Sequence, residues 1–170
     1  DYASNLYFSD GAVDLAVNLM KSGRGFTIVT DTNMALAGVN KAALKQLNGT
    51  VRCFMADPDV AAEAKERGVT RAIVSMERAA TLAGPVIFAI GNAPTALIRL
   101  YEMMQKGEIH PDFIIGTPVG FVNVVESKEL ICQSSVPCIV ARGRKGGSNI
   151  AAAVCNALMY QVTRTQKSGK

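Results

Sequence analysis

Three cations and three glycines lie within the seven residues from Arg142 to Ser148. A short apolar run (137–141) precedes them, and an alanine-rich helical pattern begins near Asn149. A strand, a glycine-rich turn and a helix N-terminus together form an anion site, because their backbone N–H groups point at the ligand. Arginine adds paired hydrogen bonds to a carboxylate or phosphate. The pattern predicts an anion-binding loop; the alternative is a solvent-exposed flexible turn without a ligand.

Three other groups of polar or glycine residues also follow apolar runs. Asp31 follows the run 25–30, the turn Gly91–Thr95 follows 85–90, and the loop 116–120 follows 112–116. In open α/β sheets, ligands bind outside the carboxyl ends of the strands. We therefore expect all these segments to meet at one edge of a sheet. Asp31 has two open interpretations, a ligand contact or a structural hydrogen-bonding role.

The elements that must position these residues are strands alternating with helices. The apolar runs are continuous rather than alternating, which is typical of parallel strands that are covered on both faces. We predict a three-layer α/β/α fold with a five-stranded parallel sheet of flavodoxin-like order, in a single domain at 1–162 with a polar tail at 163–170. The expected strands are 25–30, 50–55, 85–90, 112–116 and 137–141. The expected helices start near Ser9 (as cap), Asn33, Pro58, Thr70, Pro94, Asn123 and Gly147, the last one ending at Gln161.

Composition excludes several classes of partner. The net charge of +4 is modest, tryptophan is absent and aromatic residues make up 6% of the chain, which disfavours nucleic-acid binding. No apolar run approaches the roughly 18 residues of a membrane span. The four cysteines form no C-x-x-C pair, so we expect no zinc site, and buried thiols are typical of a reducing compartment. We expect a cytoplasmic protein that binds an acidic small molecule.

Catalytic motifs are scarce. The only histidine, His110, precedes the fourth predicted strand, so it belongs at the edge opposite the proposed site. The chain contains no G-x-G-x-x-G after a strand, no Walker P-loop and no G-x-S-x-G nucleophile motif. The chain begins with Asp1 rather than Met, and we expect further residues upstream.

Taken together, several segments resemble the precorrin-8X methylmutase (precorrin isomerase) family of corrin-ring biosynthesis. The resemblance extends along nearly the whole chain and includes two long, specific motifs. The matching segments are Phe8-Ser9, Asp31-x-x-Met34, Ala89 to Leu97, Gly116-x-Pro118-Val119-Gly120-Phe121-Val122 with Glu126-Ser127-Lys128, and Val140-x-Arg142-Gly143-Arg144-x-Gly146-Gly147-Ser148.

The resemblance implies a homodimeric isomerase that acts on an acidic tetrapyrrole. The implied reaction moves a methyl group from C11 to C12 of precorrin-8X or cobalt-precorrin-8, giving hydrogenobyrinate or cobyrinate. It implies no cofactor and no protein-bound metal. The family's proton donor is a histidine in a segment before the Phe8-Ser9 match. That histidine is expected upstream of Asp1, so no catalytic residue is assigned within this chain.

Substrate contacts are expected from the loops at the predicted edge. Arg142, Arg144 and Lys145 are candidates for substrate carboxylates, and each such pair is worth on the order of 1.5–3 kcal/mol. The full set of candidate substrate-binding residues is Asp31, Met34, Arg71, Gly91, Asn92, Thr95, Pro118, Arg142, Arg144, Lys145, Gly146, Gly147 and Ser148. Two other functions stay open: a corrinoid-binding relative that lacks the acid histidine, and an unrelated flavodoxin-like nucleotide-binding domain.

Overall fold

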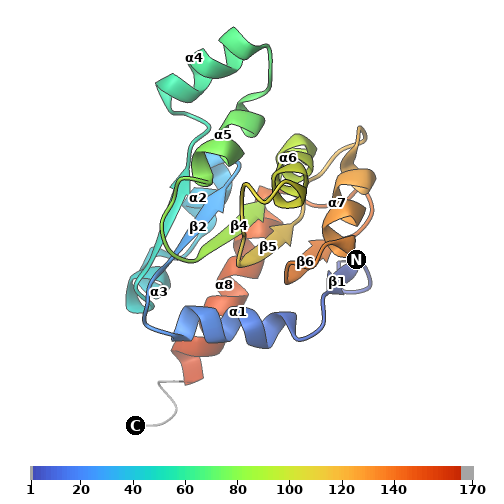
Figure 1. Ribbon diagram of the computed structural model, residues 1–170. Coiled ribbons are helices and arrows are strands. Elements are labelled where there is room, and N and C mark those ends of the chain that lie inside the picture. The colour runs from blue at the N-terminus through green and yellow to red at the C-terminus, as the bar shows by residue number, and fades with distance from the viewer. Residues whose placement is uncertain (1, 166–170) are drawn as a thin grey trace.

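A six-stranded sheet with helices on both faces forms the centre of the molecule (Figure 1). The structure, a computed structural model, describes residues 2–165. The strands follow the spatial order β1-β6-β5-β4-β2-β3. Their bounds are β1 Leu6–Phe8, β2 Phe26–Thr30, β3 Gly49–Cys53, β4 Val86–Ile90, β5 Phe113–Gly116 and β6 Cys138–Ala141.

Strands β2 to β6 are mutually parallel, and their order β3-β2-β4-β5-β6 is the predicted flavodoxin-like order. The prediction of a purely parallel five-stranded sheet is wrong, because β1 adds a sixth strand that pairs antiparallel with β6. β1 has only three residues, which is too short for a recognisable pattern. Ser9, predicted to cap the first helix, instead accepts a hydrogen bond from the Cys138 N–H at 2.9 Å.

Two hydrophobic clusters fill the space between the sheet and its two helical layers. Side chains of β4 alternate between them, so that Phe88 and Ile90 pack on one face while Ile87 and Ala89 pack on the other. All five residues of β4 are buried, as expected of a central parallel strand. The predicted three-layer arrangement is therefore present.

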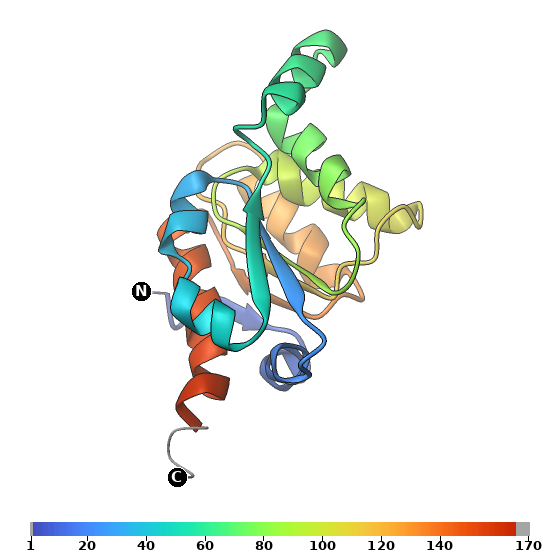
Figure 2. The same ribbon diagram turned by 90° about the vertical axis from the view of Figure 1, so that its left-hand side faces the viewer.

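The helices divide evenly between the two faces, and Figure 2 separates α2, α3 and α8 on one side from α5, α6 and α7 on the other. The first face carries α1 Ala12–Lys21, α2 Asn33–Gly38, α3 Lys41–Gln46 and α8 Ser148–Thr165. The second carries α4 Pro58–Arg67, α5 Arg71–Ala79, α6 Pro94–Gln105 and α7 Val124–Gln133.

Two helices differ from the sequence expectation. α3 was not predicted; Asn40 caps it by accepting a hydrogen bond from the Ala43 N–H at 3.0 Å. α8 continues past the predicted end at Gln161 as far as Thr165, so the first residues of the predicted tail are helical. The rest of that tail, 166–170, lies outside the described residues. Among residues 2–165, no helix combines the length and apolar character needed to cross a membrane.

Candidate functional site

The carboxyl ends of four parallel strands bring their loops into direct contact. The Thr117 N–H donates to the carbonyl of Ile90 at 2.8 Å, and the Gly147 N–H donates to the carbonyl of Thr117 at the same distance. The hydroxyl groups of Thr32 and Ser148 are 2.7 Å apart. The loops after β2, β4, β5 and β6 therefore meet at one edge, as predicted from the sequence.

Asp31 has a structural role at this edge. It is fully buried, and its carboxylate accepts backbone N–H bonds from Gly91 at 2.8 Å, Asn92 at 2.8 Å and Ala93 at 2.6 Å. Burial raises the pKa of Asp31 above its ordinary value, while the three N–H donors favour the ionised form and oppose that rise. Both oxygens face protein backbone, so Asp31 fixes the turn between β4 and α6 and does not reach a ligand.

Two predicted site glycines allow backbones to touch. A Cβ on Gly91 would lie 2.5 Å from the Cα of Ser148, and one on Gly146 would lie 2.1 Å from the carbonyl oxygen of Thr117. Any side chain at these positions would push the adjoining loops apart. Gly147 is also buried and adopts a φ of 138°, which favours glycine.

The basic loop, here residues 142–147, rests on a lysine that was not among the predicted site residues. Lys128 of α7 is fully buried, and its Nζ donates to the carbonyls of Gly143 at 2.7 Å and Lys145 at 2.8 Å. Burial lowers the pKa of Lys128 to about 8. A sequence signal existed: Lys128 occupies the helix face that also carries Val124 and Ile131, at the i, i+4, i+7 spacing of buried positions.

The two arginines of the basic loop point to different partners. Arg142 pairs with Glu129 of α7 at 2.8 Å, and its guanidinium lies 5.1 Å from the centre of the Tyr7 ring. Arg144 is exposed, and its guanidinium lies 5.8 Å from the centre of the Phe121 ring. The structure thus gives Arg142 a protein carboxylate in place of the expected substrate carboxylate. Arg144 and Lys145 are both exposed at this edge.

An apolar patch adjoins the basic loop. Phe121 is 83% exposed and Val122 is 76% exposed, both in the loop between β5 and α7, and Met34 at the start of α2 is 70% exposed. Phe121 and Val122 are neighbours in the chain and form the apolar patch beside Arg144, and exposed apolar patches mark binding surfaces. Met34 is a separate exposed apolar side chain on α2. Of these three, the sequence prediction contained only Met34, because an apolar residue in a loop carries no signal of exposure.

The remaining candidates spread around the same edge. Thr95 lies at the start of α6 with its hydroxyl 3.4 Å from that of Thr70, and Arg71 is exposed at the start of α5. Asn92 is exposed, whereas Pro118 is buried, which argues against a direct role for its ring. His110 precedes β5 at the opposite edge, as predicted. Within residues 2–165, no group of three or more His, Cys, Asp and Glu side chains is arranged to hold a metal ion.

Comparison with known proteins gives a consistent result. Residues 1–161 match the family described as precorrin-8X methylmutase. The chain is 41% identical over 154 residues to the cobalt-precorrin-8 methylmutase of Priestia megaterium, covering 91% of this chain and 68% of that protein. It is 42% identical over 161 residues to the precorrin-8X methylmutase of Pseudomonas aeruginosa, covering 93% and 76%. A crystal structure of the precorrin-8X methylmutase from Thermus thermophilus superimposes with a TM-score of 0.83 at 34% identity, covering 99% of this chain and 79% of that one.

Proposed function

This chain belongs to the precorrin-8X methylmutase family, and from that premise we propose that the edge formed by the basic loop and the apolar patch binds its tetrapyrrole substrate. The protein is an isomerase of cobalamin biosynthesis that acts on precorrin-8X or its cobalt form. The reaction is the migration of a methyl group on the macrocycle from C11 to C12.

The observation that carries the proposal is the proximity of two surfaces with different chemistry. The face of a tetrapyrrole macrocycle is flat and apolar, and its rim carries acetate and propionate carboxylates. Phe121 and Val122 offer apolar surface for the macrocycle, and Met34 on α2 is a further exposed apolar side chain. Arg144 and Lys145 offer positive charge for the carboxylates, and Arg144 lies directly over the Phe121 ring. A single ligand that is both flat and acidic satisfies both surfaces.

The residues of this edge bind and orient the substrate. We propose that the proton needed for the rearrangement comes from the histidine that the family resemblance implies, and not from His110. His110 lies at the opposite edge of the sheet, away from a ligand held by the basic loop. Holding the macrocycle against the patch restricts its orientation, which contributes to the rate independently of the proton donor.

The test of the site is a titration with hydrogenobyrinate, the reaction product, followed by visible absorption. Arg144→Ala is expected to weaken binding by about tenfold, the cost of losing one charge-assisted pair. Arg142→Ala is the matched control and is expected to change affinity less than about threefold, because Glu129 already engages Arg142. Equal effects of the two substitutions would contradict the assignment of Arg144 as the substrate contact.

A second candidate function is corrinoid binding without catalysis. It is kept because His110, the single histidine of the given sequence, lies at the edge opposite the basic loop, an arrangement that is compatible with either function. Single-turnover conversion of precorrin-8X by the protein separates the two functions. Product formation supports the isomerase, whereas tight binding without conversion supports the carrier. Tight FMN binding with no corrinoid binding would contradict both.

We also propose a homodimer and a cytoplasmic location. Exposed apolar side chains on β1 and α1 support the dimer, since Phe8 is 47%, Val13 37% and Leu15 48% exposed. Phe8 and Val13 also line a cavity of about 190 Å³ between β1, α1 and α8. The four free cysteines fit a reducing compartment. Light scattering of the protein and of Leu15→Glu tests the dimer, which the substitution should weaken.

A further inference from the structure

Lys128 carries a buried charge that the protein does not neutralise. Its Nζ bonds only to backbone carbonyls, those of Gly143 and Lys145, and among residues 2–165 it forms no ion pair with a carboxylate. Lysine is rarely fully buried without an acidic partner, because an isolated charge is costly to remove from water. The hydrogen bonds to two carbonyls offset part of the free-energy cost of burying this charge. A nearby anion would offset the rest.

The geometry of the peptide bond shows where that anion binds. In a trans peptide the C=O of one residue points opposite to the N–H of the next, and no cis peptide occurs among the described residues. Because the carbonyls of Gly143 and Lys145 point at Lys128, the N–H groups of Arg144 and Gly146 point away from it. Neither N–H has a hydrogen-bond partner in the described part of the chain.

We infer that Lys128 is a positioning residue for substrate binding: its ammonium holds two carbonyls of the basic loop so that the Arg144 and Gly146 N–H groups face a substrate carboxylate. The inference rests on the function proposed above and adds a residue that does not itself reach the substrate. The carboxylate receives two backbone N–H bonds and sits above a buried positive charge. The charge of Lys128 thus gains its counterion only when substrate is bound.

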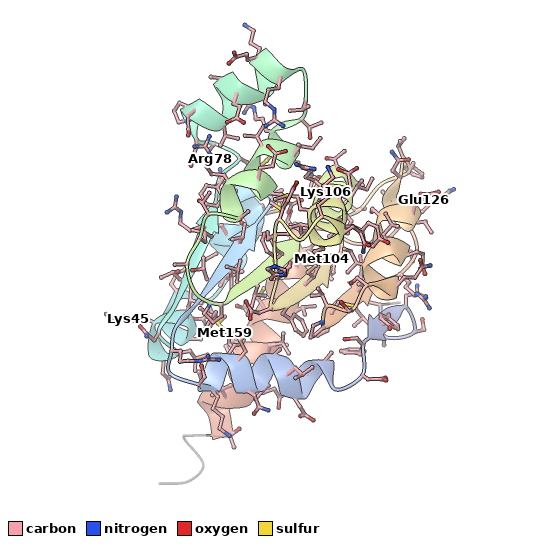
Figure 3. All side chains as sticks on the ribbon, viewed as in Figure 1. Lys45, Arg78, Met104, Lys106, Glu126 and Met159 are labelled. Carbon is pink, nitrogen blue, oxygen red and sulfur yellow. The ribbon has the colours of Figure 1, made fainter. Side chains whose placement is uncertain are left out.

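This arrangement links binding to protonation. In the free protein the pKa of Lys128 is about 8, and a carboxylate bound on the far side of the loop raises it. Beside burial, only the thiol of Cys132 acts on this pKa, and it raises it. The other charged or titratable groups on the elements packed around Lys128 are Glu126 and Glu129 on α7, Arg142, Arg144 and Lys145 on the basic loop, Tyr2 and Tyr7 near β1, Cys138 on β6, and Arg99, Tyr101 and Glu102 on α6. Figure 3 marks Glu126 on the same helix.

The first experiment compares Lys128→Met with Lys106→Met in hydrogenobyrinate titrations at pH 7. Methionine has a similar length but can neither donate nor carry charge, so Lys128→Met is expected to bind about tenfold more weakly. Lys106 is exposed at the end of α6 and is labelled in Figure 3, and its substitution should leave the affinity unchanged. Circular dichroism confirms that both variants are folded. A Lys128→Met affinity within twofold of the wild type would overturn the inference.

The second experiment measures proton uptake, which a purely structural lysine would not change. Titration calorimetry at pH 8 in two buffers of different ionisation enthalpy should show the wild type taking up about half a proton more than Lys128→Met on binding. Lys128→Gln keeps donors for the carbonyls without the charge. It should bind more tightly than Lys128→Met yet show the same low proton uptake. Equal uptake by wild type and variants would contradict the inference.

A third measurement needs no substitution. Wild-type affinity for hydrogenobyrinate should fall about tenfold between pH 7 and pH 9.5, because deprotonation of Lys128 removes the charge beneath the loop. An affinity that stays constant over this range contradicts the role of Lys128 even if every variant fails to fold. A wild-type protein that does not bind hydrogenobyrinate at any pH contradicts the proposed function instead, so the two failures are distinguishable.

Discussion

Replacing Asp31 with Asn tests whether a single buried carboxylate holds the edge together. Oδ2 of Asp31 accepts two N–H bonds, from Asn92 and Ala93, and Oδ1 accepts one from Gly91. Asn keeps one acceptor oxygen, which fits best where two donors converge, and its NH2 group then faces the Gly91 N–H. A buried N–H without an acceptor costs about 1–3 kcal/mol, and the two retained bonds lose their charge assistance. Relief from burying a charge offsets part of this, leaving a net loss of about 2 kcal/mol.

For a domain of this length, about 2 kcal/mol corresponds to a fall in Tm of about 4–8 °C. Urea unfolding and thermal scans followed by circular dichroism measure it. Asp112→Asn is the matched control, because the Asp112 carboxylate accepts one N–H bond, from Val86 at 2.9 Å, at an exposed position. Its expected loss is below about 1 kcal/mol. If Asp31→Asn costs no more than Asp112→Asn, the three hydrogen bonds do not hold the turn and the structural role assigned to Asp31 is refuted.

Three further predictions concern the stability of the folded protein. Gly146→Ala places a Cβ 2.1 Å from the Thr117 carbonyl and should cost at least about 2 kcal/mol in urea unfolding, whereas Gly116→Ala, whose nearest contact is 3.4 Å, should cost less than about 1 kcal/mol. Lys128 has a folded pKa of about 8 against an ordinary 10.5, so the unfolded state binds more protons in that range; the unfolding free energy of the wild type should rise with pH there, unlike that of Lys128→Met. Glu77 is hydrogen-bonded to Arg67 and Arg99, which lower its pKa, so Glu77→Gln should lose about 0.5–1 kcal/mol at pH 7. In urea titrations this difference should begin to shrink below the ordinary value of 4.5 and vanish as the pH falls through the lowered pKa of the folded state.

Strands β2, β4, β5 and β6 were predictable because each is a mainly apolar, mostly buried run with a glycine or polar residue at its end. β4 is the clearest case, with five buried residues followed by Gly91. β3 departs from that pattern, because its burial alternates along Gly49–Cys53 and it contains Thr50 and Arg52. β1 was not predictable, because three residues at an edge give no period and its pairing partner β6 is more than 120 residues away along the chain. The same separation explains Ser9: its hydrogen bond to Cys138 is a tertiary contact that a local capping rule cannot anticipate.

The meeting of these loops at one edge was predictable, but the roles of individual side chains were not. Sequence alone placed Asp31 at a strand end and left its two roles open, because backbone N–H donors 60 residues away carry no side-chain signature. Arg142 was expected to bind a substrate carboxylate. Only the folded chain shows that its guanidinium forms an ion pair with Glu129 and lies over the Tyr7 ring. Charge and spacing predict which residues gather at an edge, whereas their partners depend on the three-dimensional packing.

Asp31 and Lys128 hold neighbouring loops in opposite ways, and the difference indicates where the ligand's charge belongs. Asp31 receives three N–H donors on two oxygens, so its negative charge is satisfied within the protein. The ammonium group of Lys128 has three N–H donors, and two of them are hydrogen-bonded to carbonyls. No carboxylate among the described residues balances its positive charge. An anion therefore gains more on the basic loop than on the turn that Asp31 holds. Under the proposed function, we expect a substrate carboxylate above Lys128 to place the macrocycle near Phe121, whose exposed ring lies 5.8 Å from the Arg144 guanidinium.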